Sequence, residues 1–186
     1  MVKSMGKSIT KRRVIYAILS VIMMIGIFCF SARDSEKSSK DSLEVGLVVG
    51  RTFVKNFDKL SEDKQVEYAK KIDHPVRKTA HFVEYTVLGF LLLGVFVGNG
   101  AVKLLPVFMA WLLGTVYAGT DEFHQMFSSG RSCQLSDVLL DSSGAITGVM
   151  LSAVFFSLIF LLRKRRTKEI IKKDEIRGSK GERSFC

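Results

Sequence analysis

The chain has 186 residues, of which 47% are hydrophobic, and its formal net charge is +10 at pH 7. The length suits one soluble domain, but the apolar residues gather in four long blocks, more than a single buried core requires. The basic residues concentrate at the two ends of the chain. This distribution argues against a soluble globular protein and against reading the positive charge as a nucleic-acid-binding surface.

Four apolar blocks have about the length of a membrane-spanning helix. A helix needs about 20 predominantly apolar residues to cross a hydrocarbon core of roughly 30 Å. Lipid offers the backbone no hydrogen-bond partners, so spanning segments are helical. The sequence therefore predicts an all-α fold, a four-helix transmembrane bundle. The blocks are residues 14–32, 79–102, 104–120 and 142–162, and the helices predicted around the last three run over about 76–97, 103–127 and 136–162.

The first block is interpreted as an uncleaved membrane anchor. A basic start followed by an apolar core is also typical of a signal peptide. The core is long, however, and Phe30-Ser31-Ala32 lacks small residues at both positions expected for cleavage. We therefore expect this helix to remain part of the membrane domain.

The charges at the two ends predict the topology. Residues 1–13 contain five basic residues and no acidic one, and residues 163–186 open with Arg163-Lys164-Arg165-Arg166. Positive residues that flank membrane helices stay in the cytoplasm. We therefore expect two basic cytoplasmic tails and a membrane domain over 14–162, in a multi-pass protein of the cytoplasmic membrane. Its expected partner is the lipid bilayer and not nucleic acid, and the sequence indicates no oligomeric state.

Residues 33–78 are predicted to lie outside and to contain short amphipathic helices. Ser61 is predicted to cap a second helix over 62–72, and Pro75 to occupy the first turn of the next membrane helix. A mobile charged loop is the alternative. Apolar residues recur at helical spacing in the first part of this segment, namely Leu43, Leu47, Val54 and Phe57.

Ionisable residues crowd the predicted outer ends of helices two, three and four. By the helical period, Arg77, His81 and Glu84 share one face of the second helix. Ionisable groups inside a membrane are costly, and they are therefore usually paired and often functional. We predict that these side chains face one another across a cavity open to the outside. The candidate ligand-binding residues are Arg77, Lys78, His81, Glu84, Tyr85, Asp121, Glu122, His124, Gln125, Arg131, Asp137 and Asp141.

Several kinds of chemistry fit this set. Arg131 suits bidentate binding of a phosphate or a carboxylate. The candidates for acid–base catalysis are His124, Glu122 and His81. As an alternative to catalysis, these three residues and Glu84 could hold a divalent ion. The spacing of these four residues in the sequence is not a specific metal-binding signature, however. We therefore expect no metal and no cofactor.

The same residues have a purely structural alternative. Arg131 would then pair with Asp137 or Asp121, and His81 with Glu84, so that the network only locks the helices together. On the fourth helix, Gly144 and Gly148 form a GxxxG pattern, which allows helices to approach closely, either within the bundle or in a dimer.

These residues lie in ordered motifs that resemble the VanZ-like family of membrane proteins. Two positions depart from the family pattern, because Ser129 stands where proline is common and Asp141 where asparagine is expected. The motifs span most of the chain, and they are Phe30-Ser31-Ala32, Arg77-Lys78-Thr79-Ala80-His81-Phe82-Val83-Glu84-Tyr85 with Leu88-Gly89, Asp121-Glu122-Phe123-His124-Gln125-Met126-Phe127, Gly130-Arg131, and Ser136-Asp137-Val138 continuing to Gly144-Ala145 and Gly148.

The resemblance implies a four-helix bacterial membrane protein of a family associated with resistance to teicoplanin, a lipoglycopeptide that acts on cell-wall precursors. It implies no cofactor and no settled reaction. We expect an envelope protein that lowers teicoplanin sensitivity through an outward polar site for a lipid-linked or cell-wall ligand. The alternative is a membrane enzyme acting on a phosphate or headgroup of an outer-leaflet lipid. A transporter is less well supported, because four helices are few and their inner halves are apolar.

Overall fold

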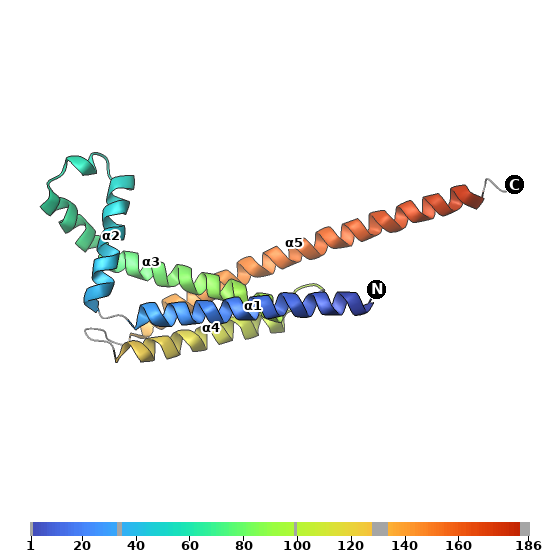
Figure 1. Cartoon of the computed structure of the whole chain (residues 1–186), viewed down its shortest axis with the longest axis horizontal. Coiled ribbons are helices and arrows are strands. Elements are labelled where there is room, and N and C mark those ends of the chain that lie inside the picture. Colours follow the sequence, from blue (N-terminus) through green and yellow to red (C-terminus); the bar gives the residue numbers. More distant parts are fainter. Residues whose placement is uncertain (1, 33–34, 99, 128–133, 183–186) are drawn as a thin grey trace.

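The computed structural model describes residues 2–32, 35–98, 100–127 and 134–182. All regular structure among these residues is helical, which confirms the predicted all-α fold (Figure 1). The elements are α1 (Val2–Ser31), α2 (Ser35–Phe53), the short 3-10 helix η1 (Phe57–Lys59), α3 (Glu62–Phe96), α4 (Leu104–Gln125) and α5 (Leu135–Glu182).

Four of the helices, α1, α3, α4 and α5, are long and apolar enough to cross a membrane. Most side chains in their apolar segments face outward, since only 17–33% of the residues in the most apolar windows are buried. Ile22, Val116 and Val154, for example, are all more than half exposed. Such a large apolar exterior marks a surface that lipid covers. The chain is therefore a multi-pass membrane protein with the predicted four spans.

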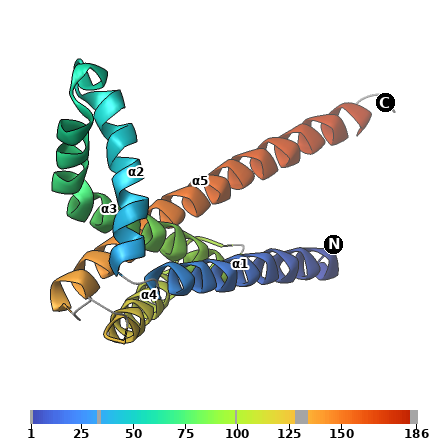
Figure 2. The ribbon, with the colours of Figure 1, turned by 60° about the vertical axis from the view of Figure 1, so that its left-hand side comes forward.

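The second spanning helix begins earlier than predicted. Pro75 was expected in its first turn, but α3 runs without interruption from Glu62 to Phe96 and contains Pro75 in its interior. Proline in a helix lacks one backbone donor and crowds the preceding turn, which bends the helix. Both ribbon views show α3 changing direction before it enters the bundle (Figures 1 and 2). The predicted helix over 62–72 is thus the first part of α3.

The α2 helix and the first part of α3 form a hairpin beside the bundle (Figure 2). The Phe57 ring closes its far end and is 1% exposed. It lies so close to Gly50 that a β-carbon on Gly50 would overlap it. At the bundle end, the Ser42 hydroxyl donates a hydrogen bond to Asp73. The amphipathic helix predicted for this segment therefore packs on α3.

Glycines set the spacing between α3 and α5. A β-carbon on Gly144 would lie 2.5 Å from the Phe82 carbonyl oxygen. One on Gly148 would meet the Thr86 carbonyl, and one on Gly89 would meet the Ala145 carbonyl. The GxxxG pattern is therefore used within the chain, where it brings two backbones together. This contact fixes the depth of the α5 residues that precede Gly144.

Arginines hold one end of the bundle. Arg12 on α1 donates to the Val97 carbonyl at 2.5 Å, and Arg13 donates to the Phe96 carbonyl at 2.8 Å. These carbonyls lie at the C-terminal end of α3, where cations are favourable. Arg12 also lies within electrostatic range of Arg163 on α5. We call this the basic end, and the opposite end, where α1 ends and α5 begins, the polar end.

Candidate functional site

The polar end brings together segments that are far apart in the sequence. The last turn of α1, the middle of α3, the last turns of α4 and the first turns of α5 lie there side by side (Figures 1 and 2). This arrangement follows from the alternating direction of the four spans. It gathers most of the candidate residues named from the sequence.

An ion pair joins α3 to α5 at this end. Lys78 Nζ lies 2.7 Å from Asp137 Oδ1, and both side chains are 32% exposed. A second pair is local to α3, where Arg77 Nη2 lies 2.8 Å from Asp73 Oδ2 one turn earlier. The candidate residues Arg77 and Lys78 are thus each engaged with a carboxylate.

A small cavity of about 30 Å³ lies next to the Lys78–Asp137 pair. This volume is enough for one ordered water molecule, which needs roughly 10–15 Å³ of the same measure. Except for one leucine, all residues that line it were candidates from the sequence. The lining residues are Lys78, His81, Glu122, Gln125, Asp137, Leu140 and Asp141.

Three carboxylates are buried at this end, of which Glu122 and Asp141 line the cavity and Asp121 lies close to Asp141. Asp121 and Glu122 are 2% exposed, and Asp141 is 3% exposed. Glu122 Oε1 accepts a hydrogen bond from the Gln134 backbone N–H at 2.8 Å, which ties α4 to the start of α5. A buried carboxylate is costly unless it is hydrogen-bonded and neutralised. These acids therefore define the chemistry of the site.

The two carboxylate oxygens of Asp121 differ in their hydrogen bonding. Its Oδ2 accepts a hydrogen bond from Gln125 Nε2 at 3.2 Å, one helical turn away. Its Oδ1 is buried and forms no hydrogen bond with the described residues. The buried Ser31 hydroxyl of α1 lies beside Asp121, but it does not meet the geometry of a hydrogen bond with any described residue.

Two tyrosines lie near the buried carboxylates. Tyr85 is fully buried, and its ring centroid is 6.2 Å from that of Tyr117. The Tyr117 hydroxyl donates to the Met24 carbonyl at 2.6 Å. The Tyr85 hydroxyl has no hydrogen-bond partner in the described part of the chain, and it lies within electrostatic range of Asp121 and Asp141.

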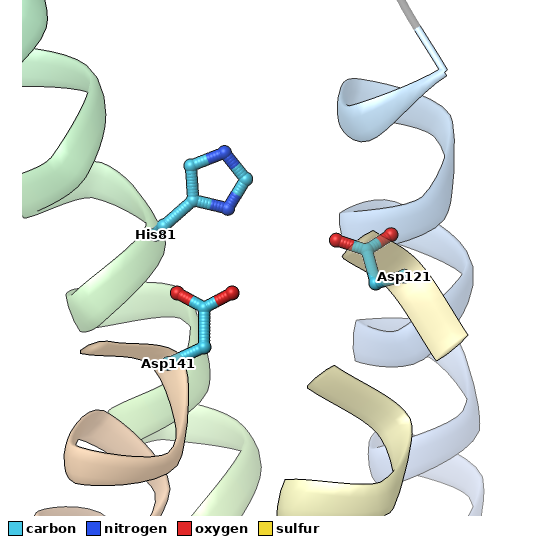
Figure 3. A group of neighbouring side chains, drawn as sticks. All are labelled: His81, Asp121 and Asp141. Atoms are coloured by element: carbon cyan, nitrogen blue, oxygen red, sulfur yellow. The ribbon is translucent and has the colours of Figure 1, made fainter. Parts of the chain in front are cut away.

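His81 of α3 lies close to the buried carboxylates Asp121 and Asp141. Its Nδ1 lies 3.8 Å from Glu84 Oε2, one turn along α3. Figure 3 shows His81, Asp121 and Asp141 reaching from α3, α4 and α5 toward a common space. One nitrogen or oxygen atom from each of the three lies within 4.8 Å of the others. Three spanning helices thus each contribute one side chain to the same space at the polar end.

Several candidate residues do not line the cavity, namely Arg77, Glu84, Tyr85, Asp121 and His124. The His124 ring packs against Phe28 of α1, with centroids 4.2 Å apart, and does not line the cavity. Arg131 lies outside the described residues, as does the Ser128–Gly130 turn. Among the three candidates for acid–base catalysis, Glu122 and His81 are the ones that reach the cavity.

The sequence reasoning missed a second polar layer. Ser142 contacts Thr115 across the α4–α5 interface, with their hydroxyl oxygens 2.8 Å apart, and Trp111 Nε1 donates to Ser142 at 3.1 Å. This layer lies further into the bundle than Asp121. Single hydroxyl residues within apolar blocks were the available signal, but they commonly bond to their own helix.

The comparisons with known proteins agree with the fold. The model of the VanZ/LLP1 family matches residues 14–160, which is well over half of the chain. Neither the curated proteins nor the solved structures give a match.

Proposed function

Because the chain belongs to the VanZ/LLP1 family, we propose that it is an envelope membrane protein that lowers sensitivity to teicoplanin and related lipoglycopeptides. Its polar end would face outward from the cytoplasmic membrane and bind a lipid-linked or cell-wall ligand. The observation that carries the proposal is the gathering of polar residues from α3, α4 and α5 around one cavity at that end.

The distribution of charge supports this orientation. Arg12 and Arg13 hold the opposite end of the bundle, and α5 continues there into Arg163 and its basic neighbours. Positive residues beside membrane helices stay in the cytoplasm. The basic end is therefore proposed to lie inside, with both termini, and the polar end outside.

The size of the cavity limits what it can hold. A volume of about 30 Å³ takes a water molecule or an ion, not a glycopeptide. A larger ligand would instead meet the rim, where Arg77 and Lys78 are about one third exposed. Both arginine and lysine bind phosphate oxygens. The proposed ligand class is therefore an anionic cell-wall lipid precursor, with its diphosphate at this rim.

Binding to the purified full-length protein tests the proposal. Labelled protein in detergent would be titrated with a polyprenyl diphosphate-linked cell-wall precursor and, separately, with teicoplanin. The expected result is saturable binding of the precursor or the antibiotic that is weakened at least tenfold by Lys78→Gln. Lys70→Gln, on the exposed first part of α3, is the matched control and should bind like the wild type. Binding of neither ligand would refute the proposal.

The buried acids favour a second candidate function, an enzyme that acts on a phosphate or headgroup of an outer-leaflet lipid. Glu122 and His81 line the cavity together and would carry out proton transfer. Glu122→Gln keeps the oxygen that accepts the Gln134 N–H but removes the charge. It should abolish turnover of such a lipid without lowering the amount of folded protein. Turnover that survives would remove Glu122 from the reaction.

A further inference from the structure

Three spanning helices each contribute one metal-ligating side chain to the same space. His81 comes from α3, Asp121 from α4 and Asp141 from α5 (Figure 3). One ligand atom from each lies within 4.8 Å of the other two. Two ligands of a single ion, each at about 2.1 Å, stand at most about 4.2 Å apart. Small side-chain rotations would therefore bring all three atoms onto one ion.

An unsatisfied oxygen points to a ligand in this space. Asp121 is 98% buried, since its exposed fraction is 2%. Its Oδ1 accepts no hydrogen bond from the described residues, whereas Oδ2 is bonded to Gln125. A buried acceptor without a donor costs about 1–3 kcal/mol, and more when it is charged. A cation bound at Oδ1 would remove this cost.

Charge repulsion points the same way. Asp141 is 3% exposed and lies within electrostatic range of four other carboxylates. Lys78, which lines the same cavity, is already 2.7 Å from Asp137. Repulsion between carboxylates is strong in a poorly solvated interior. The four carboxylates belong to Asp121, Glu122, Asp137 and Glu84.

We propose that His81, Asp121 and Asp141 bind one divalent cation of the first transition series, such as Zn²⁺ or Mn²⁺. One imidazole with two carboxylates suits these ions better than Mg²⁺ or Ca²⁺, which prefer oxygen ligands alone. This proposal departs from the sequence analysis, which expected no metal. It does not depend on the proposed function, because a structural ion would fit the same geometry.

Neighbouring groups complete the site. Glu84 Oε2 lies 3.8 Å from His81 Nδ1, and a small approach would let the carboxylate accept the hydrogen bond that orients a metal-bound imidazole. The adjoining cavity of about 30 Å³ leaves room for a water ligand. The Tyr85 hydroxyl, which has no hydrogen-bond partner among the described residues, would donate to Asp121, Asp141 or that water.

Metal content and affinity of the full-length protein test the proposal. Wild-type protein in detergent would be stripped with EDTA, incubated with Zn²⁺ or Mn²⁺ and desalted, and the retained metal measured by mass spectrometry. We expect about one ion per chain. Asp121→Asn and Asp141→Asn should each weaken binding at least tenfold. Asp73→Asn removes a partly buried carboxylate elsewhere on α3 and should retain the ion.

Either of two binding results would overturn the proposal, and so would one melting result. One is wild-type protein that retains neither metal, and the other is binding by both cluster variants equal to that of Asp73→Asn. If the variants do not fold, thermal unfolding of the wild type still tests the site. Zn²⁺ or Mn²⁺ should raise the Tm of the wild type, and EDTA should lower it. A Tm that changes with none of Zn²⁺, Mn²⁺ and EDTA would also refute the site. No lipid or antibiotic is present, so this outcome is separate from that of the proposed function.

Discussion

Lys78 on α3 and Asp137 on α5 form an ion pair of 2.7 Å at the rim of the cavity. The pair is 59 residues apart in the sequence and joins the two helices whose glycines pack most closely. The pair therefore links α3 to α5 at the polar end, and it places the Lys78 ammonium group at the rim of the cavity.

The first prediction concerns the strength of this pair. Both side chains are about one third exposed, so solvent screens much of the attraction. We expect Lys78→Met and Asp137→Asn to be coupled by about 0.2–1 kcal/mol in a double-mutant cycle of thermal or denaturant unfolding in detergent. A coupling energy of zero would contradict the expectation that this pair stabilises the bundle.

The second prediction concerns the α3–α5 contact. A β-carbon on Gly148 would overlap the Thr86 carbonyl, whereas one on Gly26 in α1 would meet nothing within 4 Å. Gly148→Ala should therefore destabilise the bundle by about 1–3 kcal/mol, the usual cost of overpacking. The matched Gly26→Ala should be neutral or slightly stabilising, because alanine favours helix. Equal amounts of monodisperse protein after heating both variants would contradict this packing.

The third prediction compares two tyrosine hydroxyls. Tyr117 donates to the Met24 carbonyl at 2.6 Å, and the buried Tyr85 hydroxyl has no hydrogen-bond partner in the described residues. Tyr117→Phe should therefore cost about 1 kcal/mol of stability. Tyr85→Phe should be neutral or stabilising in protein kept metal-free with EDTA. Both are measured as Tm shifts, and a larger loss for Tyr85→Phe would reverse the assignment.

The fourth prediction separates the hairpin from the bundle. Phe57 is 1% exposed and packs against Tyr68 and Gly50, all within the α2–α3 hairpin. Phe57→Ala removes a buried aromatic ring, which costs about 3–5 kcal/mol where the site cannot collapse. We expect limited proteolysis to cut faster between 40 and 72 while the membrane fragment persists. Phe53→Ala is the control, because Phe53 is 81% exposed and its loss should leave the cleavage rate unchanged.

Much of this architecture could be predicted from local pattern. Length and hydropathy identified the four spans, and the helical period aligned His81 with Glu84 on one face of α3. Asp137 and Asp141 were predicted at the outer end of the fourth helix, and both lie in the first turns of α5 at the polar end. These predictions succeed because they depend only on the rise and period of a helix.

Other features depend on packing that a sequence alone does not reveal. Pro75 fits a first helical turn by propensity, yet α3 continues through it because the hairpin with α2 supports the preceding turns. His124 shares α4 with Glu122 but turns toward Phe28 of α1. The face that α1 presents could not be predicted, because apolar side chains surround it almost evenly. For the same reason Ser31 was not assigned to the site, although it lies beside Asp121.

We have proposed that the polar end of the bundle provides protection against lipoglycopeptides. The most direct measurement is the teicoplanin and vancomycin susceptibility of a Gram-positive host that expresses the wild type, Glu122→Gln or the exposed control Glu67→Gln at matched membrane abundance. The account predicts that the wild type and Glu67→Gln raise the inhibitory concentration of teicoplanin at least fourfold and that Glu122→Gln does not. Unchanged susceptibility with the wild type, or full protection by Glu122→Gln, would contradict it.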